Sequence, residues 1–85
     1  LMQVEVRLFA TLRHYLPDVR VGDPYYLTLP EGATVADVLS ALGVPVDDTK
    51  QTFVNGRSVE FDYVLGDGDR VGVFPPIAGG AYGGQ

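Results

Sequence analysis

Hydrophobic and polar residues alternate along the first stretch of the chain, MQVEVRLFA. Val4, Val6 and Leu8 fall on one side of an extended backbone, whereas Arg7 and Phe9 fall on the other. Such alternation, with β-branched residues at the apolar positions, predicts a half-buried strand. The stretches YYLTLP and RVGVF have a similar pattern and predict two further strands, and TLRHYLP predicts a short helical turn between the first two.

A different spacing marks the stretch ATVADVLSALGVP. Its apolar residues recur at the interval of one helix face, at Val35, Val38, Leu39 and Leu42. Thr34 can cap the first turn and Asp37, three residues later, completes a capping box. Gly43 provides a residue that ends a helix well. This stretch predicts an amphipathic helix.

The stretch FVNGRSVEF predicts a hairpin, because Asn55 and Gly56 both tolerate the positive φ of a two-residue turn. The predicted order is strand, strand, helix, strand, strand, strand, with no internal repeat. One helix covers only one face of such a sheet, so the other face must contact water or a partner.

The alternation of residues along the predicted strands indicates which side chains lie on that second face. If Val71 and Val73 point toward the helix, Phe74 lies on the open face, where Arg7 and Phe9 can also lie. Exposed phenylalanines next to one another usually mark a binding site. The alternative is that either ring folds over the sheet edge as ordinary core.

Composition narrows the function classes. The 85 residues, 46% of them hydrophobic, suffice for one domain with one core. The chain contains no cysteine, which excludes disulfides, thiolate metal sites and a cysteine nucleophile. A net charge of −5 argues against a nucleic-acid partner. No apolar run approaches the ~20 residues of a membrane span and no signal peptide is recognisable, so a cytoplasmic location without membrane contact is expected.

The stretch FPPIAGGAYGGQ follows the last predicted strand. Pro75 and Pro76 keep the backbone extended, and the glycines after them carry no side chain. A backbone this slender can enter a channel that excludes other chains. The alternative is an unstructured chain end without function, which glycine-rich termini often are.

The stretches VEVRLFATLRHYLP, LPEGATVADVLSALG, VNGRSV and LGDGDRVGVFPPIAGG resemble the MoaD/ThiS family of sulfur carriers, in particular the small subunit of molybdopterin synthase. The resemblance implies an α+β fold, the ubiquitin-like β-grasp, with a mixed sheet of four to five strands and one main helix packed on one face. Residues 2–77 would form this domain and residues 78–85 a flexible glycine-rich tail.

The resemblance also implies a mechanism. An E1-like adenylating enzyme (MoaB-, MoeB- or ThiF-like) would use ATP to activate the carboxylate of Gly80, next to Gly79, and sulfur would convert it to a thiocarboxylate. The large subunit of molybdopterin synthase (MoaE-like) would then receive the sulfur in molybdenum or tungsten cofactor synthesis. The chain would bind no cofactor and would not be catalytic alone. The docking residues expected are Arg7, Phe9, Phe74, Pro75, Pro76 and Ile77.

The sequence departs from this family after Gly80, where AYGGQ follows. A processing protease could remove residues 81–85, or removal of Gln85 alone could expose Gly84. A third alternative is a β-grasp interaction module without carrier chemistry. A fourth is a ubiquitin-like modifier that the activated glycine attaches to lysines of other proteins. The sequence leaves the sulfur acceptor open among molybdopterin, tungstopterin, the thiamin thiazole and other pathways.

Overall fold

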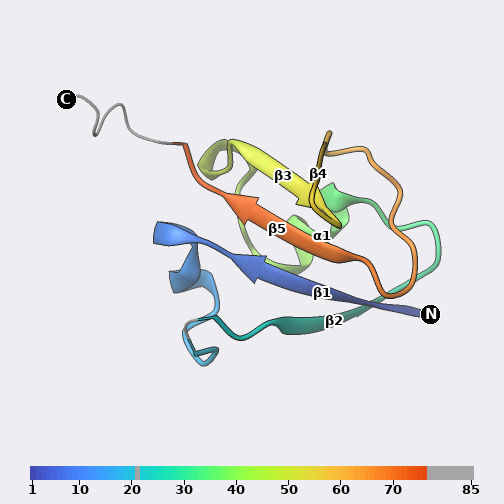
Figure 1. Ribbon diagram of the computed structural model, residues 1–85, viewed down its shortest axis with the longest axis horizontal. Helices are drawn as coiled ribbons and strands as arrows, with labels where there is room; N and C mark the ends of the chain where they lie inside the picture. Colours follow the sequence, from blue (N-terminus) through green and yellow to red (C-terminus); the bar gives the residue numbers. More distant parts are fainter. Residues whose placement is uncertain (21, 77–85) are drawn as a thin grey trace.

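A computed structural model describes residues 1–20 and 22–76 (Figure 1). In chain order its elements are β1 (Met2–Leu8), the 3₁₀ helix η1 (Ala10–Tyr15), β2 (Tyr25–Leu29), α1 (Val35–Leu42), the 3₁₀ turn η2 (Val46–Asp48), β3 (Gln51–Val54), β4 (Arg57–Val59) and β5 (Arg70–Phe74). The strands and the main helix occur in the predicted order.

The five strands form a single mixed sheet in the order β2-β1-β5-β3-β4. β1 and β5 are parallel neighbours, with Val6 opposite Val71 and Leu8 opposite Val73. The other three pairs of neighbouring strands are antiparallel. The strand nearest the end of the described chain therefore lies in the middle of the sheet, as the orange arrow of Figure 1 shows.

Helix α1 begins as the sequence predicts. The amide of Asp37 donates to the Thr34 hydroxyl, and the Asp37 carboxylate accepts from the Thr34 amide at 2.8 Å. The helix ends at Gly43, which has the left-handed conformation with φ 74°. Both ends are thus fixed locally, and the apolar stripe of the helix faces the sheet.

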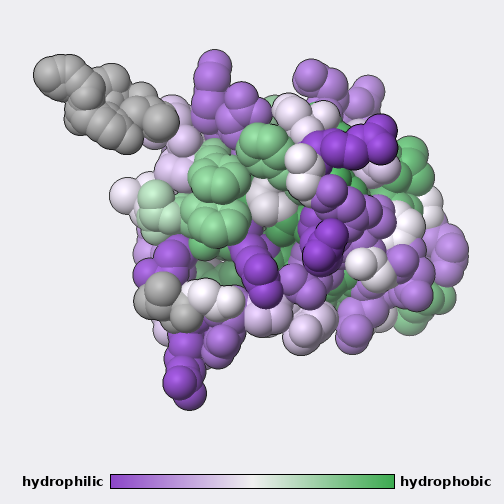
Figure 2. Space-filling view, viewed as in Figure 1, coloured by the Kyte–Doolittle hydropathy of each residue, from purple (hydrophilic) through white to green (hydrophobic). Residues whose placement is uncertain are grey.

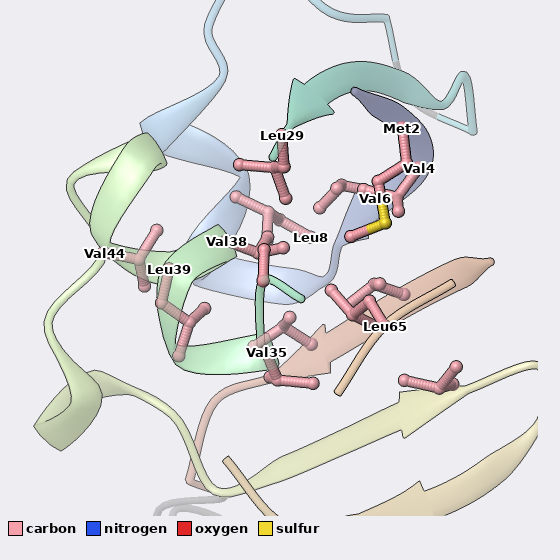
Figure 3. Close-up of a cluster of buried hydrophobic side chains, with 14 of the residues drawn as sticks. Met2, Val4, Val6, Leu8, Leu29, Val35, Val38, Leu39, Val44 and Leu65 are labelled. Carbon is pink, nitrogen blue, oxygen red and sulfur yellow. The ribbon is translucent and has the colours of Figure 1, made fainter. Parts of the chain in front are cut away.

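One hydrophobic core lies between α1 and one face of the sheet (Figure 3). It contains the inward residues of β1 and β5, the buried residues of α1, and Leu12 from η1. Fully burying such a side chain contributes about 1.5–3 kcal/mol relative to leaving it exposed. The largest side chains that are almost completely buried are Leu12, Leu39, Val4, Val6, Val35, Val38, Val71 and Val73.

The turn between β3 and β4 is the predicted two-residue hairpin. Asn55 and Gly56 have φ values of 53° and 85°, which match the mirror-image turn that suits strand twist. The turn fixes the register, in which Phe53 lies opposite Ser58. Phe53 is consequently on the same face as Gly72, its partner on β5.

Within residues 1–20 and 22–76, no helix is both long and apolar enough to cross a membrane. The expected domain at 2–77 falls almost entirely within the described residues, whereas the expected tail at 78–85, and with it the boundary between the two, lies outside them.

Candidate functional site

Three phenylalanine rings gather on the sheet face opposite α1. We call Phe9, Phe53 and Phe74 the aromatic patch. The rings of Phe9 and Phe74 stack with centroids 4.3 Å apart and 6° between their planes. Phe53 meets Phe74 edge-on, with centroids 5.7 Å apart. Both arrangements are favourable for aromatic quadrupoles. Figure 2, which views the molecule as Figure 1 does, shows apolar surface over this end of β5.

The sheet positions these rings from three different strands or strand ends. Phe9 immediately follows β1, Phe74 ends β5, and Phe53 belongs to β3. Gly72 lies beneath the Phe9 ring, where a Cβ atom would come within 3.3 Å of Phe9 Cε2. The missing side chain at Gly72 therefore lets the Phe9 ring lie close against the sheet.

The patch is open to solvent. Phe9 is 36% exposed and Phe74 is 38% exposed, although each ring has an aromatic neighbour. Neither ring is fully buried, so the expectation that both lie on the open face is confirmed over the alternative of ordinary core. Clustered exposed apolar side chains are typical of a surface that binds another protein.

Charged side chains border the patch. The guanidinium of Arg7 contacts the Glu5 carboxylate at 3.3 Å, and Arg7 is exposed on the open face as predicted. Arg70 follows the same alternation as Gly72 and Phe74 along β5. A protein that covers the patch would thus meet aromatic carbon at its centre and arginines at its border.

The chain leaves the sheet directly beside this patch. The carbonyl of Phe74 accepts a hydrogen bond of 2.9 Å from the Lys50 amide, which fixes the last residue of β5. Pro75 and Pro76 then pass a shallow depression that His14 and Asp48 also line. The start of the segment that leads to the glycines is therefore held in a defined place.

A hydrogen bond joins η1 to η2 at this exit. The Tyr15 hydroxyl donates to the Asp48 carboxylate at 2.7 Å. This bond, with smaller effects of desolvation and of the Asp48 charge, raises the pKa of Tyr15 above its ordinary value of 10.0. The neutral phenol is thus the form that the fold favours.

The structure brings together most of the residues expected to dock a partner. Phe9, Phe74 and Arg7 share the open face, and Pro75 and Pro76 follow Phe74 into the depression beside η1 and η2. Ile77, Gly79 and Gly80 lie outside the described residues. The docking role of this whole set stays a prediction.

Phe53 was not among the expected docking residues. The Asn55-Gly56 turn could have predicted its position, because a two-residue turn fixes which residues of β3 share a face.

Among residues 1–20 and 22–76, no three His, Asp or Glu side chains lie close enough together to hold a metal ion. The open face instead offers apolar contact and guanidinium groups. The chemistry that this arrangement supports directly is recognition of another molecule.

The fold and this open face define the class of the protein, a ubiquitin-like β-grasp domain. A protein of Pyrococcus furiosus assigned as molybdopterin converting factor subunit 1 superimposes with a TM-score of 0.71 at 34% identity, over 89% of this chain and 99% of that one. A chain in a complex of subunits 1 and 2 of the molybdopterin-converting factor from Helicobacter pylori has the same fold. That likeness has a TM-score of 0.60 at 19% identity and covers 93% of this chain and 100% of that one.

The family model described as Mut7-C ubiquitin matches residues 1–79, and the chain belongs to this family. Small archaeal modifier protein 3 of Haloferax volcanii is 33% identical over an alignment 96 positions long, which covers 93% of this chain and 100% of that protein. The ubiquitin-like fold and the resemblance to MoaD-like proteins that the sequence predicted are both confirmed.

Proposed function

We propose that this chain is a sulfur carrier whose activated residue is Gly80. The observation that carries the proposal is the position of the aromatic patch, directly beside the point where Phe74 leads into Pro75 and Pro76. Gly80 lies four residues beyond Pro76. A trans backbone gains at most about 3.6 Å per residue, so Gly80 is within about 14 Å of Pro76. A partner docked on the patch has Gly80 within reach.

The chemistry begins with a free carboxylate. A protease cleaves the peptide bond after Gly80 and removes residues 81–85 together with anything beyond them. An E1-like enzyme then lets the carboxylate oxygen attack the α-phosphate of ATP, which releases pyrophosphate and forms an acyl adenylate. The terminal sulfur of a partner's persulfide displaces AMP. A partner thiol reduces the resulting acyl disulfide and releases the Gly80 thiocarboxylate.

The acceptor we propose is the molybdopterin precursor in the active site of a large synthase subunit. The 34% identity to a protein assigned as molybdopterin converting factor subunit 1 supports this choice. In this reaction the thiocarboxylate sulfur attacks the pterin precursor and hydrolysis regenerates the carboxylate. The carrier supplies the sulfur atom and the docking surface, and the large subunit supplies the remaining catalytic groups.

A second function is favoured by a separate observation, the 33% identity to small archaeal modifier protein 3 across its full length. Here a lysine amine of another protein displaces AMP and forms an isopeptide bond to Gly80. The two functions share the activation step and differ only in the nucleophile.

Mass spectrometry of the protein isolated from its native cells tests both functions. The carrier predicts a species that ends at Gly80 with one oxygen replaced by sulfur. The modifier predicts lysine peptides that carry the Gly79-Gly80 remnant. Two results together would contradict both the carrier and the modifier function: a chain that always continues past Gly80, and full activity after Gly79 and Gly80 are replaced by alanine. The remaining function would then be that of an interaction module.

A further inference from the structure

A second hollow lies next to the aromatic patch. This cavity of about 190 Å³ is formed by the end of β1, by η1 and by the segment after it. We call it the arginine pocket, because Arg7, Arg13 and Arg20 line it together with Leu16, Val19 and Asp23. The arginines come from three separate parts of the chain, so only the fold brings them together.

The charge of this pocket contrasts with that of the whole chain. The sequence has 6 basic and 11 acidic residues, yet three of the basic ones line this single cavity and only Asp23 opposes them from its wall. The Glu5 carboxylate forms an ion pair with the Arg7 guanidinium at 3.3 Å. In the described part of the chain, no ion pair of 4.0 Å or less involves Arg13 or Arg20. Among the described residues, the guanidinium groups of Arg13 and Arg20 therefore have no carboxylate within that distance.

The remaining wall is apolar. Leu16, Val19 and Phe9 contribute carbon surface to the cavity. A guanidinium group binds a carboxylate through two parallel hydrogen bonds, while the carbon surface accommodates an aliphatic stem. Small-molecule sites usually enclose about 300–1,000 Å³, so this pocket suits a single side chain better than a cofactor.

The pocket is continuous with the aromatic patch. Arg7 and Phe9 line both the arginine pocket and the shallow hollow above Phe53 and Phe74. A protein that covers the patch therefore also borders the pocket. An acidic side chain on that protein would enter it from the docked position.

We propose that the arginine pocket binds a glutamate side chain of the protein that docks on the aromatic patch. This inference rests on the proposed function for the existence of such a partner. It adds the chemistry of that partner, an apolar surface with a carboxylate beside it. The pocket thus acts as a specificity site, since a partner with a lysine at that position would meet like charge.

The first test uses butyrate, whose carboxylate and three further carbons correspond to the side chain and Cα of a glutamate. We expect saturable NMR shifts at the amides of Arg13, Leu16 and Gly22, at constant ionic strength. Butyramide has the same shape without the charge and should produce none.

Arg20→Gln should weaken butyrate binding about tenfold, and Arg57→Gln, which changes an arginine outside the pocket, should leave it unchanged. Equal shifts from both compounds, or undiminished binding to Arg20→Gln, would overturn the proposal.

The second test distinguishes a partner side chain from a free anion. Arg20→Glu should weaken the complex with the purified adenylating enzyme or large subunit about tenfold or more, and Arg57→Glu should not. Replacement of the facing glutamate of the partner by arginine should restore binding to Arg20→Glu. If butyrate binds but Arg20→Glu leaves the complex unchanged, the pocket serves a free anion and the partner assignment is wrong.

The two proposals fail in different ways. Normal thiocarboxylate at Gly80 with an unaffected Arg20→Glu complex would overturn only the assignment of the pocket. Absence of any modified Gly80 in native cells would overturn the proposed function, while the butyrate titration would still report the chemistry of the pocket.

Discussion

Phe9 and Phe74 stack face to face because the parallel register of β1 and β5 brings them side by side. Leu8 lies opposite Val73, and the amide of Phe9 donates to the Val73 carbonyl at 3.0 Å. Each phenylalanine is the next residue along its strand direction, so the rings meet with 4.3 Å between centroids. A contact on the surface is thus determined by the pairing of two central strands.

The stacked pair should be measurable as a coupling energy. In a double-mutant cycle with Phe9→Ala and Phe74→Ala, we expect the two rings to stabilise each other by about 0.5–1.5 kcal/mol. Urea unfolding of the four proteins measures this. Additive losses would show that the rings do not stabilise each other in solution.

Gly72 should be intolerant of a larger side chain only while Phe9 is present. Gly72→Val places carbon where the Phe9 ring lies, and we expect a loss of about 1–3 kcal/mol in the free energy of unfolding. The matched control is the same change in Phe9→Ala, where valine suits a strand and the loss should be smaller. Equal losses in both backgrounds would contradict the role of Gly72 described above.

Asn55 should stabilise more than its own turn. Its side chain donates to Asp69 at 2.9 Å and accepts from the Arg70 amide at 3.0 Å, which ties the β3–β4 hairpin to β5. Asn55→Ala should lower the free energy of unfolding by about 1–3 kcal/mol, because both bonds are lost and φ is 53°. Asn55→Gly retains the backbone conformation and isolates the side-chain bonds. If Asn55→Gly is as stable as the wild type, those bonds contribute nothing.

The hydrogen bond from Tyr15 to Asp48 should make stability fall in alkali. The pKa of Tyr15 is higher in the folded chain than the ordinary value of 10.0, so the unfolded chain loses this proton first. The contribution is complete below the unfolded pKa and is lost as pH rises through the folded pKa. We expect Tyr15→Phe to lose less stability than the wild type as the pH rises through and above 10.0. Parallel stability curves for the two proteins would contradict this.

Phe74→Asp should separate binding from folding. The ring is 38% exposed, so its replacement should leave the fold intact while a charge enters the centre of the patch. Circular dichroism checks the fold, and calorimetric titration with the adenylating enzyme or large subunit measures the expected loss of affinity. Thr28→Asp, on β2 away from the patch, is the matched control. Unfolding of Phe74→Asp would mean that the ring belongs to the core.

Local sequence patterns were sufficient to predict the strands, the main helix and part of the candidate site. The capping box at Thr34 and the turn at Asn55 and Gly56 depend on neighbours within a few residues, and both occur as predicted. Alternation along single strands placed Arg7, Phe9 and Phe74 on one face. These features could be predicted because their causes are local.

The arginine pocket could not be predicted in the same way. Arg7, Arg13 and Arg20 belong to a strand, a 3₁₀ helix and a loop, and no periodicity relates them. Their convergence depends on how the segment after η1 packs against the end of β1. Tertiary packing of this kind leaves no regular spacing in the sequence.

The central position of β5 in the sheet also affects when the chain can fold during its synthesis on the ribosome. β1 and β2 can pair early, but the sheet cannot close until residues 70–74 have been translated and inserted between β1 and β3. Pairing across such a long sequence separation is slow compared with local folding. A nascent chain therefore cannot complete its sheet until residues 70–74 have left the ribosome, and Phe74 precedes Gly80 by only six residues.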